Sequence, residues 1–275
     1  MEKLREEHKF FTKLLSWFGG KGVIVFTMGK VGTLSIINSL DRLGIKHSHP
    51  HSLRVTRPGV HFIKDVPLSK LDIIFYLYKT IYKRIKVAIW KVYSKEIVIV
   101  TGVRDPFSRS ISAFFEQSHY LKEDIDKLAY NKVHQLFRDY YLLDSTISWF
   151  DKEIFKVFGI DVYKYDFDIN KGFCVIKKGK VRLFIYRLDK LNTLEVELKR
   201  FLSLDDFELH NTNIRSNNPD ESLKQNNYNK LKKQYKFSKM EFNNISRSKF
   251  MVHFFTKKEI EGLRKKWTNE YKKND

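Results

Sequence analysis

The sequence predicts an α/β fold, a P-loop-like three-layer arrangement in which a central parallel sheet is flanked by helices. Two short apolar, β-branched runs, at 23–26 and 96–103, are typical of buried strands. Each run is followed by a polar loop and then by a helical pattern, so strands alternate with helices. Because parallel strands end at one edge of a sheet, both loops are expected at the edge where such sheets bind ligands.

The remaining elements follow from local patterns. The first half is expected to contain a helix over 1–18, a helix from about 31 to a stop at Gly44, a short strand within 45–53 and helices over 60–95. The second half is expected to contain a helix capped by Asp105-Pro106, helices over 120–160, strands over 160–165 and 181–187 with a hairpin near Lys178-Gly179, and a closing helix over 254–271. We predict a single domain over 1–275, with a core over about 20–215 and a helical C-terminal region over about 216–275.

Composition supports a globular chain. The 275 residues are 42% hydrophobic and 15% aromatic, which is enough to build a core and argues against disorder. Cys174 is the single cysteine, so the chain forms no internal disulfide, and a reducing compartment is the simple expectation. We expect Cys174 to be a small buried residue rather than a nucleophile.

The net charge of +20 indicates anionic partners, either nucleotides, nucleic acids, acidic glycans or lipid head groups, and its sign does not choose among them. Residues 71–90 have the spacing of a basic amphipathic helix interrupted by lysines and an arginine. This helix either contacts a membrane or an anionic substrate, or packs as a surface helix. No run is long and apolar enough for a membrane span, and 1–18 lacks a signal-peptide core, so we expect a cytoplasmic protein, with peripheral association at the inner membrane face left open.

The first loop, within 26–35, has the character of a phosphate-binding turn. Glycine-containing turns can direct backbone N–H groups at an anion, and the following helix adds the positive end of its dipole. Lys30 supplies a mobile cation, while Thr33 and Ser35 supply hydroxyl groups. The lysine precedes Gly32, whereas the Walker A pattern has its lysine after the second glycine, so the loop departs from that of ATP- or GTP-hydrolysing enzymes.

The second loop, at 103–114, combines an arginine with serines. Arg104 leaves the strand end, and Ser108 and Ser112 share one face of the helix that follows. A guanidinium fork with a serine hydroxyl suits a phosphate monoester. Arg109 either helps to bind the phosphate or braces the loop.

These two loops resemble the 5′-phosphosulfate and 3′-phosphate motifs of sulfotransferases that use 3′-phosphoadenosine 5′-phosphosulfate (PAPS). Residues 104–114 match the R-D-P-x-x-R-x-x-S-A-[FY] form of carbohydrate sulfotransferases at all of its fixed positions. Residues 184–191 are similar to a late strand of that family, so the resemblance covers scattered anchors over about 22–195. The segments 149–151 and 158–163 more loosely resemble bacterial capsular polysaccharide synthesis proteins.

The resemblance implies a sulfotransferase that moves a sulfuryl group from PAPS to a hydroxyl of a carbohydrate or glycolipid, in capsular or surface polysaccharide synthesis, without a metal. The cofactor-binding residues that it implies are Gly29, Lys30, Val31, Gly32, Thr33 and Ser35 at the 5′ side, and Arg104 and Ser112 at the 3′-phosphate. Lys30 is expected to stabilise the leaving phosphate.

The catalytic base is expected among three histidines that follow the first helix. His51 lies 21 positions after Lys30, similar to the place of the base in some carbohydrate sulfotransferases, and His49 is the second choice. Glu116 and His119 are in reserve. A metal site built from the H-x-H-x-H spacing is not expected, because no neighbouring carboxylate or cysteine completes it.

Other functions stay open at this point. A P-loop kinase or other nucleotide enzyme is one alternative, a basic nucleic-acid-binding protein without a recognition motif is another, and a degenerate sulfotransferase that keeps only the fold is a third. We expect no specific nucleic-acid partner. The acceptor and the oligomeric state do not follow from the sequence.

Overall fold

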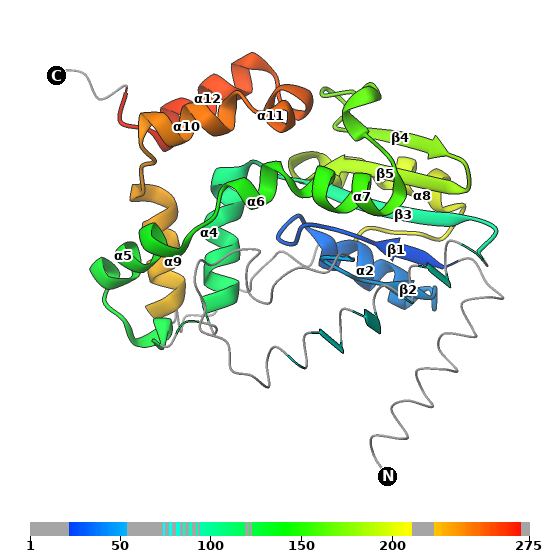
Figure 1. The fold of residues 1–275 in the computed structure, drawn as a ribbon, viewed down its shortest axis with the longest axis horizontal. Helices are drawn as coiled ribbons and strands as arrows, with labels where there is room; N and C mark the ends of the chain where they lie inside the picture. The colour runs from blue at the N-terminus through cyan, green and yellow to red at the C-terminus, as the bar shows by residue number, and fades with distance from the viewer. Residues whose placement is uncertain are drawn as a thin grey trace, which may run out of the picture.

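The computed structural model describes residues 22–53, 94–118, 121, 123–210 and 223–270, together with isolated positions between 74 and 92 (Figure 1). The expected helix over 1–18 lies outside the described residues. At the isolated positions between 74 and 92 the backbone is helical, in agreement with the expectation for that segment.

One five-stranded sheet organises the described part of the chain. Its strands are β1 (Val23–Val25), β2 (His47–Ser48), β3 (Ile97–Val103), β4 (Phe173–Lys178) and β5 (Val181–Arg187), in the order β2-β1-β3-β5-β4. The first four in that order pair in parallel, which confirms the predicted parallel sheet. The edge strand β4 is antiparallel to β5, because the two form the predicted hairpin, with Gly179 at a φ of 55° in its turn.

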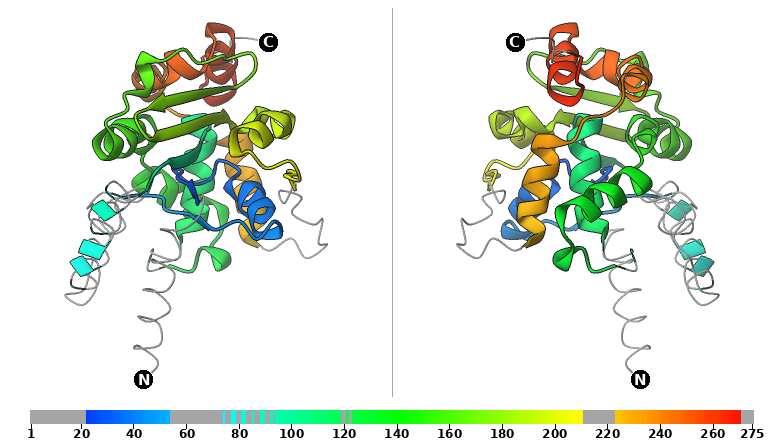
Figure 2. Two further views of the ribbon diagram at one scale, coloured as in Figure 1. Left: turned by 90° about the vertical axis from the view of Figure 1, so that its right-hand side faces the viewer. Right: turned by 90° about the vertical axis from the view of Figure 1, so that its left-hand side faces the viewer.

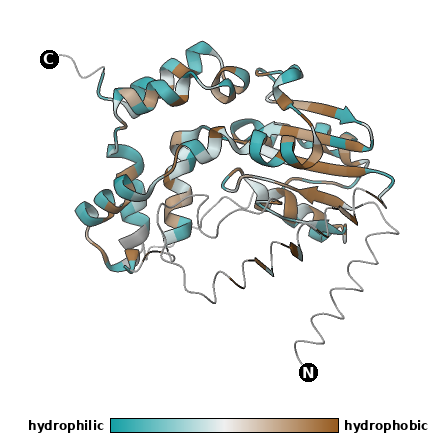
Figure 3. Ribbon diagram, in the orientation of Figure 1, coloured by the Kyte–Doolittle hydropathy of each residue, from teal (hydrophilic) through white to brown (hydrophobic). Residues whose placement is uncertain are grey.

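Helices cover both faces of the sheet, which gives three layers (Figure 2). Alternate residues of the strands point to opposite faces of the sheet. Val23 and Val25 pack against α2 (Thr33–Arg42) and α8 (Glu195–Leu202), whereas Ile24 packs against the helices on the opposite face. Both faces are apolar because both are covered, as Figure 3 shows for the central strands.

The second helical layer is the larger one. It contains α4 (Pro106–Gln117), α5 (Tyr130–Tyr140), α6 (Asp144–Ile147), the π-helix η3 (Phe150–Phe155) and α7 (Lys156–Phe158). Short 3₁₀ turns occur at η2 (Ile125–Lys127), η4 (Val162–Lys164) and η5 (Leu188–Thr193). Helix α4 begins as predicted: the Asp105 carboxylate accepts a hydrogen bond from the Ser108 N–H at 2.8 Å, and Pro106 is the first helical residue.

Two sequence predictions are wrong. Residues 160–165 are not a strand: Ile160 and Val162 alternate because both enter the core, while the Asp161 side chain accepts from the Tyr163 N–H and starts η4. The closing helix is divided, because Phe255 takes an extended conformation and Thr256 caps a new helix. The C-terminal helices are α9 (Leu223–Gln234), α10 (Lys239–Ser246), α11 (Lys249–Phe254) and α12 (Lys257–Trp267).

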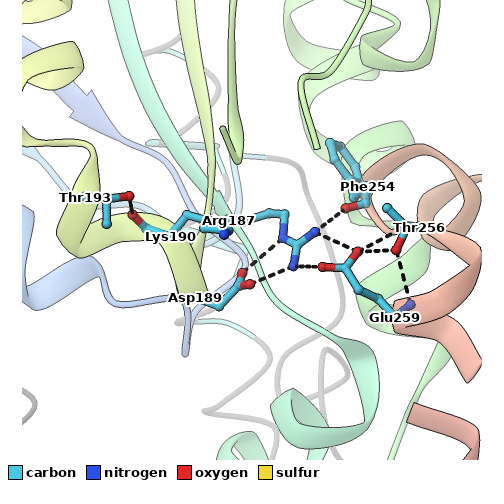
Figure 4. A network of polar contacts seen from close by, with 7 residues as sticks. All are labelled: Arg187, Asp189, Lys190, Thr193, Phe254, Thr256 and Glu259. Atoms are coloured by element: carbon cyan, nitrogen blue, oxygen red, sulfur yellow. Dashed lines mark hydrogen bonds and ion pairs between the residues drawn. The ribbon is translucent and has the colours of Figure 1, made fainter. Parts of the chain in front are cut away.

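A buried arginine joins these C-terminal helices to the sheet (Figure 4). Arg187, at the end of β5, donates to both carboxylate oxygens of Glu259 in α12, at 2.7 and 3.1 Å, and to Asp189 at 2.6 and 3.0 Å. It also donates to the Phe254 carbonyl oxygen, at 3.2 Å. The Glu259 carboxylate in addition caps α12 through Thr256. One guanidinium thus fixes α11 and α12 beside the carboxyl end of β5.

Candidate functional site

The two loops singled out in the sequence are in direct contact. They follow β1 and β3, which are paired neighbours in the sheet, so both begin at the same edge. Arg104, directly after β3, donates from Nη1 to the Lys30 carbonyl oxygen at 3.1 Å. The carboxyl edge of the sheet therefore brings together the groups that the sequence assigns to two phosphate sites.

The first loop turns through three left-handed residues. Gly29, Lys30 and Gly32 have φ values of 76°, 61° and 79°. At Gly32 a β-carbon would lie 2.6 Å from Leu188 Cδ1 and 2.9 Å from Leu191 Cδ2, so both the conformation and the packing require glycine. Lys30 adopts the same backbone region despite its side chain, which is unfavourable by about 1 kcal/mol.

Arg109 stabilises the backbone of this loop through hydrogen bonds. Its buried guanidinium donates to the carbonyl oxygens of Met28 and Gly29, the latter at 3.2 Å, and to Thr146 Oγ1 at 2.8 Å. Burial and the neighbouring charge of Arg104 lower the pKa of Arg109 to about 9, which leaves the guanidinium charged at neutral pH. Of the two roles left open by the sequence, these contacts support bracing.

The rest of the loop is fixed by further polar contacts. The Tyr186 hydroxyl donates to the Val31 carbonyl oxygen at 2.9 Å, and the hydroxyls of Thr27 and Thr33 are 3.1 Å apart. Ser35 is buried in the first turn of α2. The side chain of Lys30, by contrast, is about a quarter exposed, and its Nζ lies 3.6 Å from the Glu116 carboxylate. The side chain of Lys30 therefore projects from a rigid backbone.

A positive environment surrounds Ser112 on α4. Its hydroxyl lies 3.1 Å from the hydroxyl of Tyr228, which α9 places against α4. Burial opposes ionisation of Tyr228, but the hydrogen bond with Ser112 and the charges of Arg104 and Lys232 outweigh burial and lower the pKa of Tyr228. An environment that favours a phenolate also favours a bound anion.

A cavity of about 540 Å³ opens beside Arg104. Arg104 lines it from the loop after β3, Ser108 lines it from α4, and Lys232 and Lys266 line it from α9 and α12. Its apolar walls are Leu188, Phe255 and Leu263, and its acidic lining residues are Asp105, Asp189 and Glu259. Apolar walls with cationic groups at the mouth suit a flat heterocycle that carries phosphate.

The histidine segment returns to the same loop. His51 Nδ1 lies 3.0 Å from the Thr27 carbonyl oxygen, and since a carbonyl only accepts, Nδ1 carries a proton and the neutral ring has its lone pair on Nε2. A β-carbon on Gly29 would lie 3.6 Å from His51 Cε1, so the ring is adjacent to the loop backbone. His49 packs edge-on against His51, and burial, with the nearby charges of His51 and His47, lowers the pKa of His49 to about 4. His49 is thus a neutral ring at physiological pH.

Two residues of the second layer hold the His51 segment in place. Trp149 Nε1 donates to the His51 carbonyl oxygen at 3.1 Å. The buried carboxylate of Glu153 accepts from Ser52 Oγ at 2.7 Å and from the Leu53 N–H at 2.9 Å. Glu153 lies on the π-helix η3, and such irregular turns are frequent near functional sites.

The sequence-predicted residues largely gather in one place. The carboxyl edge of β1 and β3 brings together the loop residues 29–33, Arg104, Ser112, His51 and Glu116. Ser35 is buried in α2. His119 lies outside the described residues. In the described ranges no three His, Cys, Asp or Glu side chains converge as metal ligands would. Cys174 is buried in β4, and burial raises its pKa to about 12.

Sequence reasoning missed four residues that complete the site: Trp149, Glu153, Tyr228 and Lys232. Trp149 and Glu153 act on a segment about 100 residues away, for which no local pattern exists. Tyr228 and Lys232 are four residues apart and so share one face of α9, a spacing that was hidden in a lysine- and asparagine-rich run.

The fold and this edge define a three-layer α/β protein in which two polar loops follow neighbouring strands and contact each other. Residues 120–256 match the model of a family described as "putative capsular polysaccharide synthesis protein", and no sulfotransferase family accompanies this match. The match includes Trp149, Glu153 and Tyr228 but neither of the two loops. No curated protein and no solved structure matches the chain. The looser of the two resemblances is thus the one supported, and it indicates a role related to polysaccharide synthesis.

Proposed function

We propose that the protein is a sulfotransferase that uses PAPS and sulfates a hydroxyl of a carbohydrate or glycolipid in capsular or surface polysaccharide synthesis. The observation that carries this proposal is the contact between the two loops, in which Arg104 donates to the Lys30 carbonyl. Two loops that follow adjacent strands, each with groups that can bind an anion, suit one ligand that has a phosphate at each end. The similarity of residues 120–256 to capsular synthesis proteins supports a glycan acceptor.

Each residue has a defined part in this proposal. The N-terminal end of α2 and Lys30 bind the 5′-phosphosulfate, while Arg104, Ser112, Tyr228 and Lys232 bind the 3′-phosphate. The cavity beside Arg104 accommodates the nucleoside between its apolar walls. These groups fit PAPS because the cavity beside Arg104 combines basic and apolar lining residues.

The transfer needs positioning and charge stabilisation more than covalent help from the protein. The acceptor oxygen forms a bond to sulfur as the bond between sulfur and the bridging phosphate oxygen breaks, and that oxygen keeps the electron pair. Lys30 stabilises the negative charge on the leaving phosphate. His51 takes the acceptor proton at Nε2, with its ring oriented by the Thr27 carbonyl. Glu116, beside Lys30, is the alternative base.

Ligand-induced thermal stabilisation tests the donor. We expect 3′-phosphoadenosine 5′-phosphate to raise the melting temperature, because a ligand at about 100 times its Kd adds about 2.7 kcal/mol. Arg104→Ala should lose most of this shift. Arg138→Ala is the matched control, since Arg138 is an exposed arginine on α5 away from both loops.

ADP, and ATP with Mg²⁺, are the comparison ligands. A larger shift with ATP and Mg²⁺ than with the 3′-phosphate compound would favour the P-loop kinase alternative and contradict the proposal. Equal shifts in Arg104→Ala and the parent protein would contradict the assignment of the 3′-phosphate site. A positive result justifies a screen of glycan acceptors with radiolabelled PAPS.

A further inference from the structure

The described positions between 74 and 92 carry several exposed apolar side chains. Six of the apolar side chains described in this segment are between 50% and 70% exposed, at helical spacing: Ile74, Leu77, Tyr78, Ile81, Ile85 and Val92. Tyr82 and Ile89, by contrast, are partly buried. The coloured pieces of this segment lie away from the sheet in both Figure 1 and Figure 2. The other large exposed apolar residues described, such as Val175 and Met240, are distributed over several strands and helices. Exposed apolar residues that share one helical face indicate an interaction surface.

The sequence of this segment selects the kind of partner. Between Asp72 and Glu96 there are six basic residues and no acidic one: Lys79, Lys83, Arg84, Lys86, Lys91 and Lys95. The same stretch contains six aromatic residues: Phe75, Tyr76, Tyr78, Tyr82, Trp90 and Tyr93. Tyrosine and tryptophan favour the boundary between lipid head groups and hydrocarbon, and lysine and arginine attract anionic head groups.

A second copy of this chain is a poor occupant of the face. Two such helices would bring basic residues together without any acidic residue of the segment to neutralise them, and the whole chain carries a net charge of +20. An anionic lipid surface supplies both the apolar layer and the opposite charge. No helix in the described ranges is long and apolar enough to cross a bilayer.

We propose that the apolar face of 74–92 lies in the interface of an anionic membrane and holds the protein there peripherally. This inference is independent of the proposed chemistry, because none of the site residues belongs to the segment. Of the two alternatives that the sequence left open, a packed surface helix and a lipid-binding one, it takes the second. If the acceptor is a glycolipid, the same contact brings the site to its substrate.

Vesicle cosedimentation of the full chain tests the proposal. We expect the parent protein to sediment with vesicles of equal parts phosphatidylcholine and phosphatidylglycerol, and at least about tenfold less with phosphatidylcholine alone. High salt should weaken the binding by screening the basic residues. The double variant Ile81→Asp/Ile85→Asp should bind anionic vesicles about tenfold or more weakly, because it places two carboxylates in the apolar face.

A matched double variant, Met240→Asp/Val252→Asp, replaces two apolar residues that are also highly exposed but lie on α10 and α11. It should bind like the parent protein, and both double variants should keep the parent melting temperature. Failure of the parent protein to bind anionic vesicles, or unchanged binding by Ile81→Asp/Ile85→Asp, would overturn the proposal. Sedimentation velocity without lipid supplies the last arm: a parent dimer that the same double variant dissociates would make the face a protein interface instead.

Discussion

The backbone and the side chain of Lys30 have different roles. Its backbone is left-handed, and its amino group lies 3.6 Å from the exposed carboxylate of Glu116. An exposed ion pair of this kind adds little to stability. The side chain is thus available for a role in ligand binding without being needed for the fold.

We therefore expect Lys30→Ala to lose turnover while its melting temperature stays close to that of the parent protein. Sulfuryl transfer from radiolabelled PAPS and thermal unfolding are the two measurements. Lys171→Ala, which removes a lysine from a comparable exposed pair with Asp168, is the control and should keep full activity. An active Lys30→Ala enzyme would exclude Lys30 from the transition state.

The two arginines of the second loop differ in kind. Arg109 is buried and saturated by loop carbonyls and Thr146, whereas Arg104 lines an open cavity. Arg109→Met should cost about 3 kcal/mol of unfolding free energy, because it leaves several buried acceptors without donors. Arg104→Met should change stability much less and ligand affinity much more. Urea denaturation of both variants, with and without 3′-phosphoadenosine 5′-phosphate, distinguishes the roles, and equal destabilisation would contradict them.

At the scale of elements, the short π-helix η3 positions a segment that has little structure of its own. The chain from His49 to Leu53 extends beyond the two-residue strand β2, and Trp149 and Glu153 supply the hydrogen bonds that a longer strand would have had. The orientation of the His51 ring consequently depends on η3 as well as on the first loop.

Glu153→Gln tests this dependence. The substitution replaces one acceptor oxygen by an N–H₂ group, which then faces the donor of either Ser52 or Leu53. We therefore expect a loss of about 1–3 kcal/mol in stability and a lower kcat. If His51 is the base, the pH profile of kcat should also shift, which a purely structural role would not produce. Asp151→Asn on the same element, whose carboxylate pairs with the exposed Lys249, is the control and should leave both the profile and the stability nearly unchanged.

At the scale of the whole molecule, the C-terminal helices complete a site that begins in the N-terminal half. Helix α9 adds Tyr228 and Lys232 beside Ser112, and α12 adds Lys266 to the cavity wall. The position of α12 relative to the sheet depends on the contacts of Arg187 with Asp189 and Glu259 (Figure 4). Substitutions that remove the contacts of Arg187 with Glu259 and Asp189 should therefore weaken ligand binding as well as stability.

The ion pair between Arg187 and Glu259 also predicts that the stability of the protein depends on pH. Burial raises the pKa of Glu259, but the hydrogen bonds from Arg187 and Thr256 outweigh burial and lower it. A carboxyl with a lowered folded-state pKa contributes stability above its unfolded value of about 4.3, and that contribution is lost as the pH falls through the folded value. Glu259→Gln should thus be less stable than the parent at neutral pH, and the difference should shrink on acidification below about pH 4. Urea denaturation across this range measures the effect, and a constant difference would contradict it.

The sequence by itself determined the features that depend on neighbouring residues. The apolar runs at β1, β3 and β5, the Asp105-Pro106 start of α4 and the left-handed stop at Gly44 were all predictable, because each follows from side chains a few residues apart. The two loops were placed at one sheet edge for the same reason, since strand–loop–helix units have a fixed polarity.

Only the tertiary structure decided which distant groups meet. The alternation at 160–165 was interpreted as a strand, yet Ile160 enters the core just before a 3₁₀ turn and Val162 enters it from the first residue of that turn, because burial and not strand pairing sets their spacing. Glu153 meets Leu53 and Tyr228 meets Ser112 across about 100 residues of chain. Such contacts arise from packing of whole layers, where the hydrophobic effect fixes positions that no local pattern encodes.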